Sequence, residues 1–158
     1  MKKQKGFSLI ELLIVVAIIL IIAAIAIPNL LRSRMAANEA SAVGSIRTIN
    51  TAEVTYSTTY PAIGFATLTQ LGGVASTCAT TATSSLACLI DSTLAGGVKS
   101  GYTFAAAVSG TAPFVQYTAT GVPTVVGQSG QRGFYSDQSG VIRYDAAGAL
   151  PTNASPAL

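Results

Sequence analysis

The first thirty residues carry one long apolar block. Residues 12–27 are an unbroken run of sixteen apolar side chains, and further apolar positions extend this block from Phe7 to Leu31. A helix needs about 20 mostly apolar residues to span the hydrocarbon core of a bilayer. The pattern therefore predicts a membrane-spanning helix over residues 7–31.

After Arg34 the pattern changes to an apolar residue at every third or fourth position, which is typical of an amphipathic helix. The polar residues between these positions are expected to face water. Tyr60-Pro61 should end the helix, because a residue before proline disfavours helical geometry. We therefore expect an amphipathic segment over residues 32–60, in one helix from Phe7 to about Thr59 whose apolar half protrudes from the head. The expected buried positions are Ala36, Ala40, Val43, Ile46, Ile49, Ala52 and Tyr56, and the expected solvent-facing ones are Arg47, Asn50, Glu53 and Ser57.

Residues 61–158 have the composition of a small globular head. Residues 61–100 are rich in Thr, Ser, Ala and Gly, and we expect a loop region with little regular structure. Aromatic and β-branched runs bounded by turn residues predict an antiparallel sheet within residues 101–145. A tight turn over 137–140 should join its last two strands, and residues 146–158 should be loose surface chain. The four predicted strands are 102–108, 114–119, 133–136 and 141–144.

The charge is concentrated before the apolar block. The formal net charge of +3 comes from Lys2, Lys3 and Lys5, and beyond Gly6 the six basic and six acidic side chains cancel. The leading lysines should hold that end of the helix in the cytoplasm and place the head outside it. A nucleic-acid partner is disfavoured, and it stays open only if a filament repeats the few cations of the head along its surface.

A secretory signal peptide is the competing interpretation of a basic segment followed by an apolar one. The apolar run here is longer than such a signal usually has. Ala24-Ile25-Ala26 only weakly resembles a small-residue cleavage site. We therefore favour the membrane helix.

The sequence offers little chemistry for an enzyme. It has no histidine and two cysteines, Cys78 and Cys88, which excludes the usual zinc patterns and a Cys-His nucleophile pair. The two cysteines form either a local disulfide or a pair of free thiols. We expect no catalytic residue, no metal site and no cofactor.

A carboxylate, Glu11, stands at the threshold of the apolar run. An acidic residue within a membrane helix is costly and calls for a partner. Cleavage after Gly6 would create an α-amine on Phe7, four positions upstream. In a bundle of staggered identical helices, the amine of one copy could pair with Glu11 of the next and guide assembly. The alternative is a glutamate that reaches the lipid headgroups.

The stretch Lys5-Gly6-Phe7-Ser8-Leu9-Ile10-Glu11, followed by the apolar run and Pro28-Asn29, closely resembles the N-terminal signature of type IV pilins and the related pseudopilins. The resemblance implies an α+β fold with one long helix packed on a small antiparallel sheet. It also implies a leader of residues 1–6, cleavage between Gly6 and Phe7 by a prepilin peptidase, and N-methylation of Phe7. In such filaments a proline loosens the helix as subunits pack, so we expect a kink or local melting near Ala24–Pro28.

The family further implies partners and a location. Before assembly the subunit resides in the bacterial inner membrane as a single-pass protein with its head outside the cytoplasm. It then polymerises with other copies of the same chain into an extracellular pilus. A pilus assembly platform and minor pilins take part. A minor pilin or a type II secretion pseudopilin remains an alternative, although the acidic calcium-binding loop usual in major pseudopilins has only Asp137 and Asp145 available here. A monomeric membrane-anchored binding domain is the alternative of another class.

Overall fold

The computed structural model describes residues 7–73, 78 and 82–158. The predicted leader, including Gly6, lies outside them. The chain divides into two compact units, Met1–Arg34 and Met35–Leu158, and each is described by itself.

The long helix α1 covers Leu9–Thr59 and confirms the predicted helix to within two residues at its start. In the first unit every described side chain is exposed except the half-buried Ala23. Pro28 lies inside α1, and the helix continues without a break from Ala24 through Pro28. The local melting expected there is therefore not present in the isolated chain.

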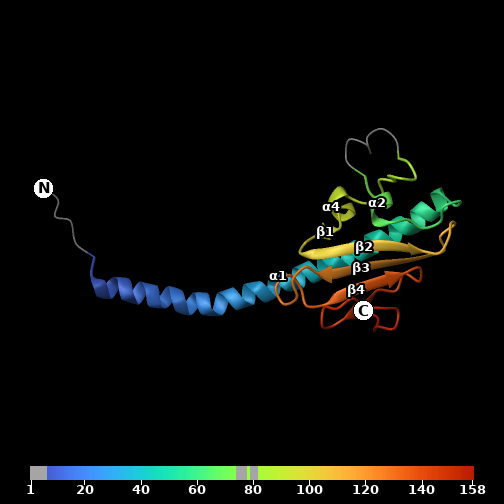
Figure 1. Cartoon of the computed structure of the whole chain (residues 1–158). Coiled ribbons are helices and arrows are strands. Elements are labelled where there is room, and N and C mark those ends of the chain that lie inside the picture. The colour runs from blue at the N-terminus through green and yellow to red at the C-terminus, as the bar shows by residue number, and fades with distance from the viewer. Residues whose placement is uncertain (1–6, 74–77, 79–81) are drawn as a thin grey trace. The chain divides into compact units, whose positions relative to one another are not determined.

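In the second unit α1 lies across one face of the sheet (Figure 1). Ile46, Ile49 and Tyr56 are fully buried, as their helical spacing predicted. Two expectations for this segment are wrong: Ala36 and Ala40 are exposed, and Glu53 is completely buried instead of facing water. The buried face is displaced from the predicted one, and it consists of Ala42, Ser45, Ile46, Ile49, Ala52, Glu53 and Tyr56.

Five antiparallel strands form one sheet in the order β1-β2-β3-β4-β5, which confirms the α+β fold class. In β2, buried Tyr102, Phe104 and Ala106 alternate with exposed residues, because successive side chains of a strand point to opposite faces. The buried face packs against α1 and forms the core of the head. The strands cover Val98–Lys99 (β1), Tyr102–Ser109 (β2), Gln116–Pro123 (β3), Gly133–Asp137 (β4) and Arg143–Asp145 (β5).

Strand β3 begins two residues later than predicted and continues four residues further. Phe114 instead hydrogen-bonds to the chain after α1, where its carbonyl accepts from Phe65 N at 2.9 Å. Gly121 lies within this extension of β3 and pairs with Phe104 in the sheet. A Cβ at position 121 would lie 2.9 Å from the Phe104 ring, so this glycine serves a close approach and not a turn.

The predicted turn between β4 and β5 is confirmed, with Gly140 N donating to Asp137 O at 2.9 Å and Gly140 at a φ of +72°. Strand β5 begins two residues later than predicted. The Ser136 hydroxyl bonds to the Val141 carbonyl at 3.2 Å, and this contact takes the place of strand pairing there.

The tail after Ala146 is not loose, so this prediction was wrong. Tyr144 N donates to Pro156 O at 3.0 Å, and Leu158 N donates to Ile142 O at 2.9 Å. The tail can return because the Asp145 carboxylate accepts from Ala147 N and Ala149 N and bends the chain. The last residues therefore run beside β5.

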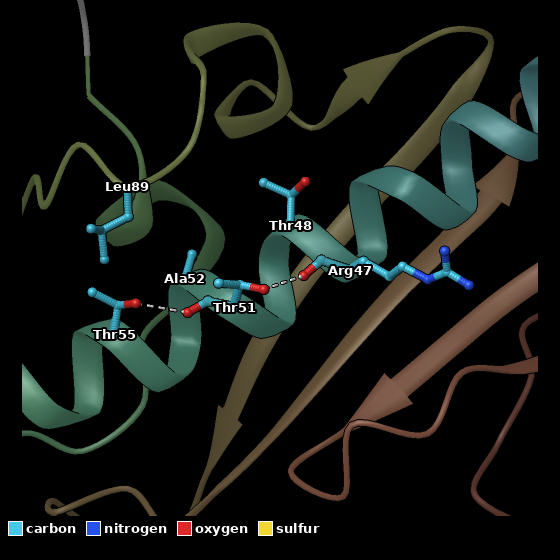
Figure 2. A pocket seen from close by; sticks show the side chains of 6 residues that line it. All are labelled: Arg47, Thr48, Thr51, Ala52, Thr55 and Leu89. Carbon is cyan, nitrogen blue, oxygen red and sulfur yellow. Dashed lines mark hydrogen bonds between the residues drawn. The ribbon is translucent and has the colours of Figure 1, made fainter.

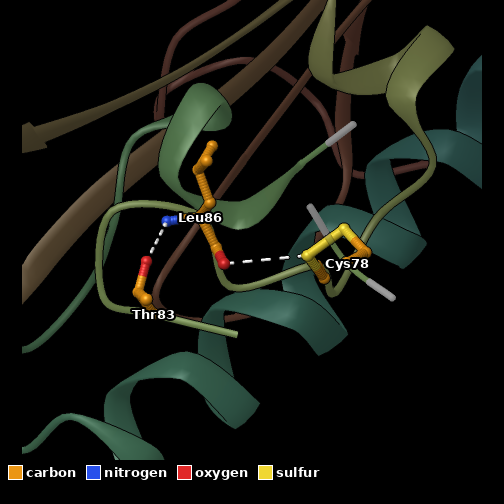
Figure 3. The surroundings of a disulfide bond; sticks show 4 residues. Cys78, Thr83 and Leu86 are labelled. Carbon is orange, nitrogen blue, oxygen red and sulfur yellow. Dashed lines mark hydrogen bonds between the residues drawn. A yellow bond between two sulfur atoms is a disulfide. The ribbon is translucent and has the colours of Figure 1, made fainter. Parts of the chain in front are cut away.

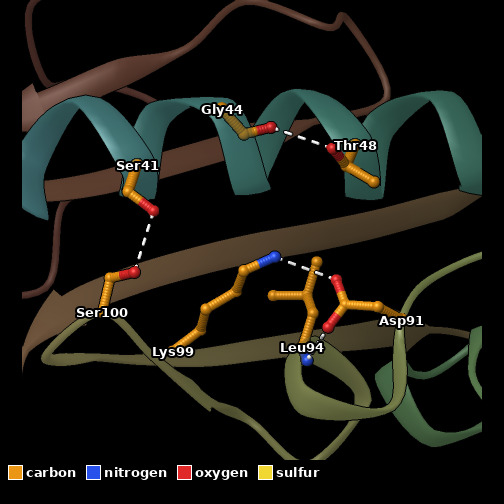
Figure 4. A network of polar contacts seen from close by, with 7 residues as sticks. All are labelled: Ser41, Gly44, Thr48, Asp91, Leu94, Lys99 and Ser100. Carbon is orange, nitrogen blue, oxygen red and sulfur yellow. Dashed lines mark hydrogen bonds and ion pairs between the residues drawn. The ribbon is translucent and has the colours of Figure 1, made fainter.

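The region 61–100 is more ordered than predicted. It contains the one-turn helices α2 (Leu68–Leu71) and α4 (Ser92–Ala95) as well as β1. The Asp91 side chain caps α4 by accepting from Leu94 N at 2.9 Å, and it pairs with Lys99 at the same distance (Figure 4). Elements of four residues are too short to show a helical period, which is why the composition alone suggested a loop.

The structure decides between the two cysteine states in favour of a disulfide between Cys78 and Cys88 (Figure 3). Beside it, Cys88 Sγ lies 3.7 Å from the Leu86 carbonyl, and Leu86 N donates to the Thr83 hydroxyl at 3.3 Å. The bond ties the chain after α2 to the segment that leads into α4.

Replacing both cysteines with serine is expected to lower the free energy of unfolding of the head by about 2 kcal/mol, because the bond restricts a short loop in the unfolded chain. Urea unfolding of the mature protein in detergent measures the change. Chemical reduction of the wild type is the matched control and should give the same loss. Equal stability of the oxidised, reduced and serine forms would contradict the prediction.

Candidate functional site

The start of α1 holds the predicted assembly residues. Ser8 N donates to Glu11 Oε2 at 2.9 Å, and Leu12 N donates to Ser8 O at 3.2 Å. A glutamate three residues into a helix that bonds back to the preceding serine forms half of a capping box. Its negative charge also suits the positive end of the helix dipole.

Glu11 thus has a backbone partner within its own chain, which the sequence analysis missed. The signal was present as Ser8-Leu9-Ile10-Glu11, the serine-to-glutamate spacing of a capping box. In the isolated chain the carboxylate is therefore positioned without a cation.

Phe7 lies just before the helix with 74% of its surface exposed. Among the residues that the structure describes, no hydrogen bond joins Phe7 to Glu11. The proposed partner of Glu11 belongs to a second copy, so pairing between copies stays a prediction, as does cleavage at Gly6.

The apolar segment that follows is uncovered. Its sixteen large aliphatic side chains between Leu9 and Leu31 are each 43–73% exposed. Soluble monomers rarely show apolar patches of more than a few hundred Å². By length and composition α1 can cross a membrane. Lipid or other protein must cover this surface in the cell.

Pro28 interrupts the hydrogen bonding of this segment without ending the helix. It has no N–H to donate to the carbonyl of Ala24 one turn earlier. In the next turn the Ser33 hydroxyl donates to Asn29 O at 3.0 Å, a type of contact that often bends a helix. Pro28 therefore marks a weak point in an otherwise continuous helix.

In the head, Glu53 is the buried ionisable residue that the sequence analysis misplaced. Its Oε2 accepts from Ala66 N at 2.9 Å, while its buried Oε1 has no hydrogen-bond partner. Burial raises the pKa of Glu53 from 4.5 to about 7, although the bond from Ala66 acts in the opposite direction. A polar residue within a helical period gives no signal that it is buried.

A second carboxylate, Glu39, fixes the chain before β4 to α1. It accepts from Gln131 N at 2.8 Å and forms an ion pair with Arg132 at 2.8 Å. Partial burial works to raise the pKa of Glu39, but these bonds outweigh it and hold the pKa below its ordinary value. The Arg132 guanidinium also lies 5.7 Å from the ring centres of Phe134 and Tyr144.

The described part of the chain contains no cluster of three or more His, Cys, Asp or Glu side chains that could hold a metal ion.

Comparison with known proteins finds similarity over part of the chain. Residues 1–27 match the family model described as the prokaryotic N-terminal methylation motif. Over 39 residues the chain is 64% identical to the type IV wide pilus major component PilA4 of Thermus thermophilus, and the match covers 25% of this chain and 30% of the relative. Over 54 residues it is also 43% identical to the type IV major pilin protein PilA of Myxococcus xanthus, covering 34% and 24% of the two chains. Part of this chain is therefore similar to type IV pilins.

The matches span less than a third of the length of these curated relatives. No solved structure matches the chain significantly. The long helix on an antiparallel sheet agrees with the pilin fold that the sequence resemblance implied.

Proposed function

We propose that the chain is a structural subunit of a type IV pilus, held in the inner membrane before it polymerises into a helical filament. The observation that carries this proposal is the exposed apolar half of α1 with one carboxylate, Glu11, in its first turn. Lipid covers such a surface before assembly, and the same segments of neighbouring copies cover it in a filament. The similarity to two major pilin proteins supports a role as a pilus subunit.

Processing prepares the subunit. A prepilin peptidase cuts between Gly6 and Phe7 on the cytoplasmic side, and the new Phe7 amine is methylated. The match of residues 1–27 to an N-terminal methylation motif supports this step. The assembly platform then moves the subunit out of the bilayer, with minor pilins as further partners.

Glu11 changes partner during assembly. In the isolated chain it accepts a hydrogen bond from Ser8 N at 2.9 Å. In the filament the α-amine of Phe7 from a neighbouring copy neutralises it as both groups leave the headgroup region. The attraction between two charges grows as water is removed, so this pairing selects one stagger of the helices.

Pro28 adapts the helix to the filament. Because a turn that contains proline lacks a backbone hydrogen bond, it loosens at a lower cost than its neighbours. The unbroken helix seen here is the form before assembly, and we expect extension near Ala24–Pro28 afterwards.

A structural subunit needs no catalytic centre, and we propose no enzymatic activity. A pseudopilin or a minor pilin would share the N-terminal segment. A monomeric membrane anchor would have no use for Glu11. The abundance of this chain in sheared surface filaments separates these alternatives, since a major subunit supplies nearly all of their mass.

We expect the mature protein to begin at Phe7 and to carry a methyl group on its amine. Mass spectrometry of the N-terminal peptide from purified membranes measures this. The matched control is Gly6→Leu, which should leave the leader attached, because the bulky side chain blocks the scissile bond. A terminus at Met1, or one near Ala26, would contradict the proposed processing.

A further inference from the structure

A groove runs between α1 and the segment that leads into α4 (Figure 2). Leu89 forms one wall of the groove. The cavity volume of the groove is about 310 Å³. We call this surface the α1 groove, and it is lined by Arg47, Thr48, Thr51, Ala52, Thr55 and Leu89.

The threonines make this groove largely apolar. Their hydroxyls donate to the helix backbone, Thr51 to Arg47 O at 3.0 Å and Thr55 to Thr51 O at 2.9 Å. Thr48 does the same to Gly44 O at 3.0 Å (Figure 4). Since these donors are satisfied within α1, the threonines can lose water at little cost.

One end of the groove carries an unpaired positive charge. Arg47 is exposed, and its side chain extends away from Leu89 (Figure 2). Lys99 and Arg132 pair with carboxylates, and Arg143 donates to the Ser155 carbonyl at 2.9 Å. Within residues 35–73, 78 and 82–158, Arg47 is the cation whose side chain has no hydrogen-bond or salt-bridge partner. The groove thus suits an occupant with one carboxylate.

The turn between β4 and β5 is such an occupant. Asp137 accepts from Ser139 N at 2.9 Å through Oδ1, and no cation of the described part of the chain lies within salt-bridge distance of it. The tip residues 138–140 are exposed. Asp145 is less available, because the same carboxylate oxygen holds two backbone N–H groups of the following turn.

The groove and the turn belong to segments near opposite edges of the sheet, and Figure 1 shows α4 near β1 and β4 on the far side of β2 and β3. Leu89 precedes α4, which packs beside β1 at one edge of the sheet, whereas β4 and β5 form the other edge. Two complementary surfaces at different places on one molecule join copies head to tail, which gives a ring if the rotation closes and an open filament if it does not, instead of a two-fold dimer.

We propose that the β4–β5 turn of one copy docks in the α1 groove of a second copy, with Asp137 facing Arg47. This inference rests on the proposed filament function and adds a contact between heads to the one between helices. The methyl groups and Leu89 supply the apolar contact. The ion pair sets the register, since charge complementarity favours specificity over raw affinity.

Charge reversal in the full-length protein, expressed with its export machinery, tests the pairing. Arg47→Glu and Asp137→Arg should each reduce sheared filaments about tenfold, because each places like charges together. The double exchange should restore them. Thr59→Glu is the control for a new glutamate on α1 outside the groove. It changes the charge by one unit, whereas Arg47→Glu changes it by two, and it should have no effect.

Cross-linking tests the geometry without reversing a charge. Thr51→Cys combined with Ser139→Cys should give an oxidised ladder of dimers, trimers and larger species in filaments, because the two native cysteines are already bonded to each other. Thr51→Cys with Ser109→Cys places the second thiol at the end of β2 and should give no ladder.

The outcomes separate this inference from the proposed function. If wild-type filaments form, but the reversals leave their amount unchanged and the cysteine pair gives no ladder, the head contact is wrong and the pilus function stands. If the wild type forms no filament with its machinery present, the function fails and the head contact fails with it.

Discussion

Replacing Glu11 with alanine is expected to abolish filaments and to leave membrane insertion intact. The substitution removes a charge from an apolar helix, so insertion becomes no harder. In a filament it would leave the neighbouring Phe7 amine without a partner. Breaking a buried ion pair by removing one member costs about 3–5 kcal/mol. Electron microscopy of sheared filaments and membrane fractionation measure the two effects.

The bond from Ser8 to Glu11 requires a sharper control, because alanine also removes a helix cap. Losing a cap costs about 1 kcal/mol, which is less than the cost of an orphaned charge. Glu11→Gln keeps an oxygen that can accept from Ser8 N but has no charge. We expect it to fail in assembly like alanine. Normal filaments in Glu11→Gln would show that capping and not charge is what matters, and normal filaments in Glu11→Ala would overturn the mechanism altogether.

The stability of the head is expected to fall as the pH rises from about 5 to about 7, because of Glu53. Burial raises its folded pKa from 4.5 to about 7, so between these values the folded state holds a proton that the unfolded state has released. The contribution of such a group to the free energy of unfolding is fully present below pH 4.5, and it is lost as the pH rises through 7. The loss is at most about 3 kcal/mol. Urea unfolding of the mature protein in detergent at a series of pH values measures it.

Glu53→Gln should remove this slope, because glutamine can accept from Ala66 N and stays neutral. The range from about pH 5 to about pH 7 is favourable for this measurement, because the chain has no histidine that would titrate there. Glu39→Gln is the matched control. The pKa of Glu39 is lowered, so its loss should reduce stability throughout this range without changing the slope. A slope that persists in Glu53→Gln would show that another group is responsible.

Periodicity predicted α1 well because a helix of 51 residues repeats its pattern many times. It placed Ile46, Ile49 and Tyr56 correctly. It failed at Glu53, since a carboxylate is expected at the surface and only the position of Ala66 N shows why one side chain oxygen can be buried. The burial of Glu53 therefore depends on a contact with a residue outside the helix, which the local pattern does not reveal.

The head shows the same division. The β4–β5 turn was predicted because Gly140 gives a strong local signal. The start of β3 was not, since Phe114 bonds with the chain after α1, about fifty residues earlier in sequence. The returning tail was missed for a similar reason, as its partners Ile142 and Tyr144 are not apparent from its own composition.

For the candidate site, the residues were predicted better than their contacts. Arg47 was expected on the solvent-facing side of α1, and it is exposed. Glu11 was expected at the threshold of the apolar run, and it lies in the first turn of α1. The partner of Glu11 within its own chain was missed. A carboxylate in an apolar helix was expected to pair with a cation, whereas its partner is the backbone N–H of Ser8. The α1 groove could not be predicted, since Leu89 reaches it only through the folding of the region 61–100.

The border of the sheet at β5 is covered, because the returning tail hydrogen-bonds beside this strand through Tyr144 and Ile142. Long open strand edges invite other chains to add to them, which is a route to amyloid. A copy of this head that meets another at the β5 border therefore finds little free backbone. Contact at that border has to be made by side chains, which disfavours irreversible strand addition.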